Sequence, residues 1–276
     1  MRILSPSLIM LGMLVWPFMG SAATPSMPID VLFNDPIEDN NFVNRGWYDG
    51  PEAYTVTMDS DNAAVNGSSA SIAALYQQGE TKPSWVNMRH SLLETENVYL
   101  SFYVKYSSNW VGSGLSYHPH EFCFLTNKSG VYAGGYGQEL TLYVEQNGLT
   151  PRTAYANPGN VNGVFHDSIT TDIEVNRWYR VEAFFKLNTM TGSSGNSDGI
   201  IKYWLDGELL VDVDDALFRD GSNNTDMMIN QLIFQPYMGN GSPVTQTMWV
   251  DDLIVGTENP DAGGAIPNPP SSLAVE

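Results

Sequence analysis

The stretch that decides the fold is NSDGIIKYWLDGE, residues 196–208, which LLVDV follows at residues 209–213. Short apolar and aromatic runs alternate here with Gly, Asn and Asp turn residues, a pattern typical of antiparallel strands. Asp206-Gly207 separates two such runs, and both residues tolerate the positive φ that a tight hairpin needs. Residues 229–237 and 248–255 repeat the pattern after further turn clusters. We therefore expect this end of the chain to be all-β.

Strand-like runs of this kind recur along most of the chain, whereas heptads and long amphipathic helices are missing from the sequence. Many short strands at close spacing predict an all-β fold, a two-sheet antiparallel jelly-roll sandwich. One short helix is expected near residues 215–220. The ten expected strands are residues 69–76, 85–92, 98–106, 120–126, 139–145, 178–187, 200–205, 209–213, 229–235 and 248–255.

The two ends of the chain differ from this middle part. Residues 1–23 combine one basic residue, an apolar run and a small-residue segment, which is the pattern of a cleaved signal peptide. An uncleaved anchor is the alternative. Residues 257–276 are rich in Pro, Gly and Ser and are typical of a flexible tail or linker. We expect a secreted or periplasmic protein with a single folded domain, residues 24–256.

The composition limits the partners. The formal charge is −19, and loss of Arg2 with the signal peptide gives −19 − 1 = −20. This charge repels nucleic acid and anionic membrane surfaces, so we expect neither as a partner after signal cleavage. The single cysteine, Cys123, cannot form an internal disulfide, so the fold must depend on its core. We expect a monomer.

Several expected strands have one apolar face and one face of Tyr, Gln, Arg, Glu and Ser, since successive residues point to opposite sides of a sheet. Such a polar face suits sugar rings, which stack on aromatic side chains and hydrogen-bond through their hydroxyls. An ordinary solvated sheet face is the alternative interpretation. The residues expected to bind substrate are Asn87, Tyr103, Tyr143, Glu145 and Lys202.

The C-terminal part also contains a set of motifs in a fixed order. They are Asp198-Gly199, Tyr203-Trp204, Asp206-Gly207, Phe218-Arg219, Gly239, Gly241-Ser242, Trp249, Asp251-Asp252 and Val255. Together they resemble the C-terminal half of concanavalin A-like jelly-roll polysaccharide lyases, closest to the alginate and glucuronan lyases of polysaccharide lyase families 14 and 20. The resemblance covers residues 180–256 by motif and the earlier chain by strand pattern. Residues 110–120 also resemble part of a group of secreted bacterial proteins with this fold.

This resemblance implies β-elimination on a uronic-acid polysaccharide. The reaction must neutralise a carboxylate, remove the C5 proton and protonate the departing O4. Arg89 is the expected carboxylate ligand, since a guanidinium binds carboxylates bidentately, and Gln235 assists it. His120 is the expected base because imidazole titrates near neutrality, and Tyr237 is the expected acid. His118 completes the expected catalytic set.

These roles have structural alternatives. Arg89 could pair with a neighbouring acid such as Glu145 and have no substrate to bind. Tyr237 could be a packing residue at a strand end, and Lys202 could be a solvated residue. His90 lies on the apolar face of its strand, so we expect a core histidine there.

Two kinds of metal site fit the sequence. His118 and His120 have a spacing that suits a metal pair, although no third ligand is evident, and a structural role at a loop edge is the alternative. By resemblance to concanavalin A-like domains, Asp252 is expected to hold structural Ca²⁺ together with Asp35 or Glu38. The alternative is that one aspartate caps a turn. No organic cofactor is expected.

Other functions remain open. A glycoside hydrolase needs two carboxylates across the scissile bond, and the Glu-x-Asp-x-x-Glu pattern of related jelly rolls is not present in the sequence. A non-catalytic, lectin-like carbohydrate-binding domain needs only the polar-aromatic face. The charge bears on the glycan, because repulsion between polyanions is screened within about 3 Å at 1 M salt but only within about 10 Å at 0.1 M. A uronic-acid polymer therefore suits a salty medium, and a neutral glycan suits fresh water.

Overall fold

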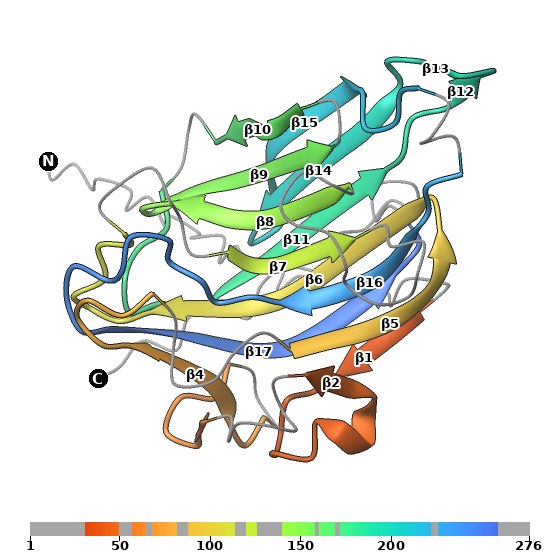
Figure 1. Ribbon diagram of the computed structural model, residues 1–276. Coiled ribbons are helices and arrows are strands. Elements are labelled where there is room, and N and C mark those ends of the chain that lie inside the picture. Colours follow the sequence, from red (N-terminus) through yellow and green to blue (C-terminus); the bar gives the residue numbers. More distant parts are fainter. Residues whose placement is uncertain are drawn as a thin grey trace, which may run out of the picture.

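Two antiparallel β-sheets pack face to face in the computed structural model (Figure 1). The structure describes residues 31–49, 57–64, 68–81, 88–113, 120–125, 140–157, 160–168, 172–221 and 226–258. The all-β sandwich expected from the sequence is thus confirmed. In the described part of the chain, no helix is long and apolar enough to cross a membrane.

The first sheet has eight strands, in the order β15-β14-β11-β6-β17-β4-β3, with β1 paired to β17 beside this path. Its long central strands are β6 and β17, and β17 brings the C-terminal part of the chain into the middle of the sheet. The bounds are β1 Val31–Asp35, β3 Met58–Asp59, β4 Ser71–Tyr76, β6 Asn97–Tyr106, β11 Tyr179–Lys186, β14 Gly199–Leu205, β15 Glu208–Ala216 and β17 Gln246–Gly256.

The second sheet has seven strands, in the order β10-β9-β8-β7-β16-β5-β2. A two-stranded ribbon, β12 with β13, lies apart from both sheets, and one 3-10 turn, η1, precedes β2. The bounds are η1 Val43–Arg45, β2 Trp47–Asp49, β5 Met88–Thr95, β7 His120–Leu125, β8 Thr141–Asn147, β9 Thr150–Asn157, β10 Asn160–Asp167, β12 Met190–Thr191, β13 Ser194–Gly195 and β16 Ile229–Phe234.

The core fills the space between the two sheets with the apolar faces that strand alternation predicts. Phe102 from β6 contacts Phe122 from β7 edge to face, with ring centroids 4.7 Å apart. Phe122 in turn lies 5.0 Å from Phe234 of β16. All three rings are almost completely buried, and burial of such side chains stabilises a fold by about 1.5–3 kcal/mol each. His90 joins this layer, stacked on Phe33 at 3.7 Å, as expected of a core histidine.

The tight hairpin at Asp206-Gly207 connects β14 and β15. Asp206 has φ 51° and Gly207 has φ 84°, so both turn residues adopt the left-handed conformation. The Asp206 carboxylate also accepts a hydrogen bond from the backbone N–H of Arg180, at 2.9 Å. The turn is therefore tied to β11 as well as to its own two strands.

All ten expected strands have a counterpart in the structure, but five further strands of the two sheets lie outside the predicted ranges. These are β1, β2, β3, β9 and β10. Strand β9 has the sequence TPRTAYAN, whose small and polar residues carry little hydrophobic signal. The helix expected near residues 215–220 is wrong, because β15 continues to Ala216 and the following backbone turns toward Asn188.

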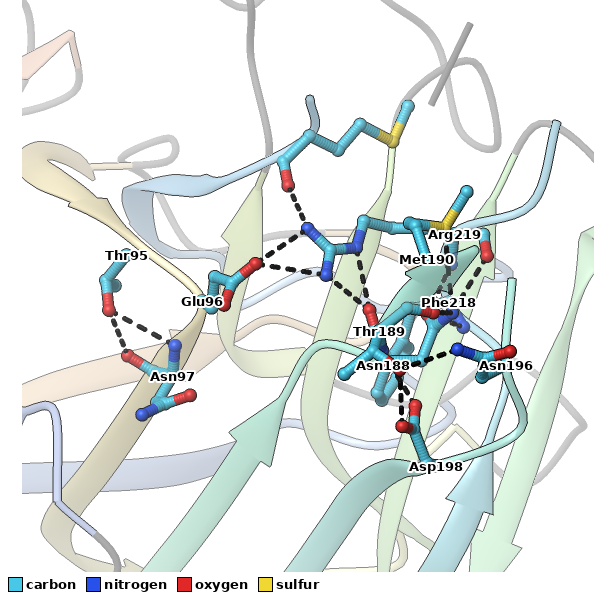
Figure 2. A network of polar contacts seen from close by, with 11 residues as sticks. Thr95, Glu96, Asn97, Asn188, Thr189, Met190, Asn196, Asp198, Phe218 and Arg219 are labelled. Atoms are coloured by element: carbon cyan, nitrogen blue, oxygen red, sulfur yellow. Dashed lines mark hydrogen bonds and ion pairs between the residues drawn. The ribbon is translucent and has the colours of Figure 1, made fainter. Parts of the chain in front are cut away.

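That turn is held by a polar network, shown in Figure 2. Asn188 accepts hydrogen bonds from the backbone N–H groups of Phe218 and Arg219, at 3.0 and 2.7 Å. The buried Arg219 guanidinium donates to the backbone oxygens of Asn188 and Met227 and to the Glu96 carboxylate. Phe218-Arg219, one of the motifs that carry the family resemblance, therefore stabilises the loop that follows β15.

Candidate functional site

One row of side chains crosses the face of the seven-stranded sheet that is turned away from the core. We call this face the outer face and these seven residues the central row. Cross-strand pairing places each member opposite the next on the neighbouring strand. From β2 to β10 the central row is Tyr48, Arg89, Ile233, Cys123, Tyr143, Ala154 and Phe165.

The middle of the central row is apolar and buried, although it lies outside the core. Ile233, Cys123, Tyr143 and Ala154 belong to a separate hydrophobic cluster, and none of them is more than 4 % exposed. Burial raises the pKa of the Cys123 thiol well above its ordinary value, so the thiolate needed for nucleophilic chemistry does not form. Cys123 therefore acts as a small buried hydrophobic residue.

A guanidinium lies toward each end of the central row. At the β5 end, Arg89 Nε lies 2.8 Å from the Asp49 carboxylate, and the Arg89 side chain keeps 12 % of its surface exposed. At the β9 end, the Arg152 guanidinium lies over the Phe165 ring, 4.1 Å from its centroid. Four strand spacings of about 4.8 Å separate β5 from β9, so the two guanidinium-bearing strands are about 19 Å apart.

Glu145 and Arg152 form an ion pair beside the buried middle of the row. Arg152 Nε lies 2.7 Å from Glu145 Oε1 and 3.7 Å from the Asp167 carboxylate. Glu145 is only 1 % exposed, so this is a buried ion pair. The pairing of Arg89 with Glu145 that the sequence left open is replaced by two pairs, Arg89 with Asp49 and Arg152 with Glu145.

Gln235 follows β16 directly and lies on the same outer face. Its side-chain oxygen accepts a weak hydrogen bond from the Cys123 thiol, at 3.4 Å. Its backbone N–H donates to the backbone oxygen of Glu121 on β7, at 3.1 Å. Tyr237, two residues further on, is 39 % exposed. Gln235 therefore lies beside the central row, and Tyr237 is exposed to solvent.

The expected histidines are described only in part. The backbone of His120 begins β7 and pairs with Glu145 of β8, which brings it next to the ion pair on the outer face. His118 and Asn87 lie outside the described residues, and their roles stay predictions. The structure thus gathers Arg89, Gln235, Tyr143 and Glu145 on one face, with the backbone of His120 at its edge.

Two expected substrate-binding residues lie elsewhere. Tyr103 is on β6 and Lys202 is on β14, both in the eight-stranded sheet, on its face away from the core. Lys202 Nζ lies 3.7 Å from the Asp212 carboxylate. Burial raises the pKa of the Tyr103 phenol, and the charge of the nearby Arg180 offsets part of this rise. The structure does not bring these two residues together with Arg89. Strand alternation separates the faces of one strand, but it does not say to which sheet the strand belongs.

Two of the three acids expected to bind calcium, Asp35 and Glu38, have partners of their own. Asp35 accepts hydrogen bonds from the Trp47 indole at 2.6 Å and from the backbone of Ile37 at 2.9 Å, and it lies 2.9 Å from Arg45 Nε. Glu38 accepts a hydrogen bond from the backbone N–H of Ser69, at 2.7 Å. In the described residues no group of three or more His, Cys, Asp or Glu side chains could hold a metal ion. Calcium at Asp35, Glu38 and Asp252 stays a prediction.

Several residues of this face were missed in the sequence. Tyr48 accepts a hydrogen bond from the Gln231 side chain and extends the polar part of the row beyond Arg89. Arg152 and Phe165 form the opposite end. The sequence gives little sign of these strands, because β2 has only three residues and β9 lacks an alternation of apolar residues. The one available sign is that Arg152 alternates with Ala154 and Ala156, as residues on one face of a strand do.

Comparison with known proteins supports the fold. No protein-family model matches the chain, and no curated protein matches it. Among solved structures, alginate lyase vAL-1 from Chlorella virus is 14 % identical, with a TM-score of 0.57 over 83 % of this chain and 100 % of that chain. An endo-beta-1,4-glucuronan lyase from the fungus Trichoderma reesei is 17 % identical, with a TM-score of 0.55 over 83 % of this chain and 96 % of that chain.

The same fold also occurs in a protein that is not named as a lyase. The globular domain of T. cruzi calreticulin is 12 % identical, with a TM-score of 0.50 over 84 % of this chain and 90 % of that chain. At such identities a structural likeness establishes the fold and not the reaction. The chain therefore has the jelly-roll fold of alginate and glucuronan lyases, as the sequence motifs indicate.

Proposed function

We propose that this protein binds an acidic polysaccharide along the outer face of the seven-stranded sheet and cleaves it by β-elimination. The observation that carries the proposal is the gathering of Arg89, Gln235 and Tyr143 on that face, with His120 at the adjoining end of β7. The fold shared with alginate and glucuronan lyases supports a polysaccharide as the ligand.

The proposed chemistry assigns one task to each polar group. Arg89 binds the carboxylate of a uronate residue, and Gln235 donates a hydrogen bond to the same group, which stabilises the negative charge that develops when C5 loses its proton. His120 accepts that proton. The C5–H electron pair becomes the C4=C5 double bond, the C4–O4 bond breaks, and Tyr237 gives its proton to the departing O4. The products are a shortened chain and a chain with an unsaturated uronate end.

In this proposal the substrate carboxylate displaces the Asp49 carboxylate from Arg89. Asp49 is about half exposed, so water can solvate it once Arg89 turns to the substrate. Arg152 is less available, because both it and Glu145 are almost completely buried in their pair. Arg89 is therefore the cation of this face that we assign to the substrate.

The test is the ultraviolet absorbance of the conjugated double bond, followed while the protein acts on alginate, glucuronan and other polyuronates. Absorbance should rise with at least one polymer, in salt high enough to screen the net charge of −19. A flat trace with every polymer, across pH and with and without Ca²⁺, would show that the protein is not a lyase.

A non-catalytic carbohydrate-binding domain is the second candidate. It is favoured by one observation, namely that both guanidinium groups near the central row already have carboxylate partners. Affinity electrophoresis separates the two functions. Retardation by a polysaccharide without any absorbance change would support binding alone, and no retardation by any acidic or neutral glycan would exclude both.

Export is part of the proposal. The signal-peptide pattern in residues 1–23 would place the protein in a compartment where extracellular polysaccharides are accessible. Mass spectrometry of the protein from the culture medium of a secreting host should give a chain that starts near residue 24. A full-length chain that stays with the cells would contradict export.

A further inference from the structure

A carboxylate is buried between the two sheets, directly behind the outer face. Glu121 of β7 has no exposed surface. The hydroxyl of Tyr106, from β6 of the opposite sheet, and the side-chain amide of Gln146, from β8, both donate hydrogen bonds to Glu121 Oε1. Within the described residues, Glu121 Oε2 has no hydrogen-bond partner. Such a buried acid usually has a specific role, because leaving it partly unsatisfied costs stability.

The backbone explains how an acid comes to lie there. Phe122 and Phe124 point into the core, so plain alternation would put Glu121 on the outer face with Cys123. The pairing of β7 with β8 shifts register between His120, opposite Glu145, and Phe122, opposite Val144. One extra residue is therefore inserted in β7, which is a β-bulge, and it turns the Glu121 side chain into the core. Bulges re-aim side chains and are frequent next to active sites.

The bulge adjoins two residues of the proposed site, one through the chain and one through a hydrogen bond. The residue before Glu121 is His120, whose backbone it places opposite Glu145. The backbone oxygen of Glu121 also accepts the hydrogen bond from the backbone N–H of Gln235, at 3.1 Å. Glu121 thus connects β7, which carries the expected base His120, to the end of β16, which Gln235 follows.

We propose that Glu121 is a positioning residue: its buried carboxyl, held by Tyr106 and Gln146, fixes the bulge that sets His120 and Gln235 on the outer face. This inference deepens the proposed function and rests on it for the roles of those two residues. The bulge itself can be tested without any substrate.

The surroundings of Glu121 favour its neutral form. The pKa of Glu121 is raised to about 8: burial raises it most and the nearby Glu145 adds to this, whereas the hydrogen bonds from Tyr106 and Gln146 oppose the rise. The other groups that face it are the phenols of Tyr76 on β4 and Tyr203 on β14, whose pKa values burial raises well above the ordinary value. At neutral pH Glu121 is therefore largely protonated. Its ionisation would strengthen the two hydrogen bonds that it accepts but would place a charge in the core, so the surroundings of the bulge should change as Glu121 ionises.

The experiment compares three variants by NMR, without substrate. Glu121→Leu removes the carboxyl and leaves an apolar side chain, and Glu121→Gln keeps an oxygen acceptor but cannot ionise. Phe124→Leu is the matched control, because it alters the same core face of the same strand without touching the bulge. The resonances of the Gln235 backbone amide and of the His120 imidazole should move in Glu121→Leu. In Phe124→Leu they should stay at the wild-type positions. In the wild type the Gln235 amide should also titrate near pH 8, and in Glu121→Gln it should not.

Equal shifts in Phe124→Leu and Glu121→Leu would overturn the inference, since they would report core packing in general. If Glu121→Leu does not fold, the titration decides: its persistence in Glu121→Gln contradicts the role, and its loss supports it. The proposed function fails separately, in the absorbance assay of the wild type. If the assay is positive, Glu121→Gln should keep kcat near neutral pH and lose the alkaline limb of the pH profile that ionisation of Glu121 produces.

Discussion

At the scale of single residues, the site depends on which carboxylate each guanidinium faces. Arg89 and Arg152 lie on the same outer face. Arg152 forms an ion pair with the buried Glu145, whereas Arg89 forms one with the half-exposed Asp49. A buried pair is costly to break, whereas an exposed pair contributes about 0–1 kcal/mol. The Arg89 pair, whose carboxylate is half exposed, should therefore open for a ligand more readily than the Arg152 pair.

Replacing Arg89 with Met should weaken polyuronate binding about tenfold to a hundredfold, because a hydrogen bond to a charged group is worth about 1.5–3 kcal/mol. Lys202→Met is the matched control, since it also removes one positive charge but on the other sheet, where Lys202 faces Asp212. Affinity electrophoresis in a polyuronate gel measures both. Equal losses in the two variants would mean that net charge, and not the outer face, controls binding.

At the scale of elements, ten of the fifteen strands of the two sheets were predictable, and their sheet membership was not. The alternation in β6 and β8 assigned Tyr103 and Tyr143 correctly to faces away from the core, yet the two faces lie on opposite sides of the sandwich. Pairing between strands distant in sequence decides this, and a single sequence does not contain it. The bulge at Glu121 was hidden for a related reason, because its partners Tyr106 and Gln146 come from other strands.

The loop network in Figure 2 leads to a prediction for one glycine. A Cβ at Gly195 would lie 2.0 Å from the backbone oxygen of Arg219, so Gly195→Ala must push the β12–β13 ribbon away from that loop. The expected loss is about 3 kcal/mol in the free energy of unfolding, near the upper end for overpacking. Gly192→Ala, which meets no atom within 4 Å but has φ 64°, should cost only about 1 kcal/mol. Urea unfolding measures both, and similar values would show that the loop yields without strain.

At the scale of the whole molecule, ionisable groups inside the sandwich make stability depend on pH. Burial raises the pKa of Glu121 to about 8 and that of Asp251 to about 6, both above their ordinary values. The folded state therefore holds protons that the unfolded state has released. Their contribution is complete below the unfolded pKa values, near 4, and is lost as pH rises through 6 and 8.

The free energy of unfolding should accordingly fall between pH 5 and pH 8, by an amount on the order of a few kcal/mol. Glu121→Gln should remove the slope between pH 6 and 8 and part of the slope below pH 6, whereas Asp251→Asn should remove part of the slope below pH 6 only. Urea unfolding at a series of pH values gives the slopes. Wild-type stability that rises with pH over this interval would contradict the buried neutral carboxyl.

The central claim is that the outer face of the seven-stranded sheet cleaves an acidic polysaccharide by elimination. Mass spectrometry of the products tests it most directly, because an eliminated fragment is lighter by one water than the same fragment made by hydrolysis. We predict unsaturated fragments from the wild type and far fewer from Arg89→Met, with Lys202→Met at the wild-type level. Saturated fragments, or unsaturated ones at equal yield from Arg89→Met, would contradict the claim.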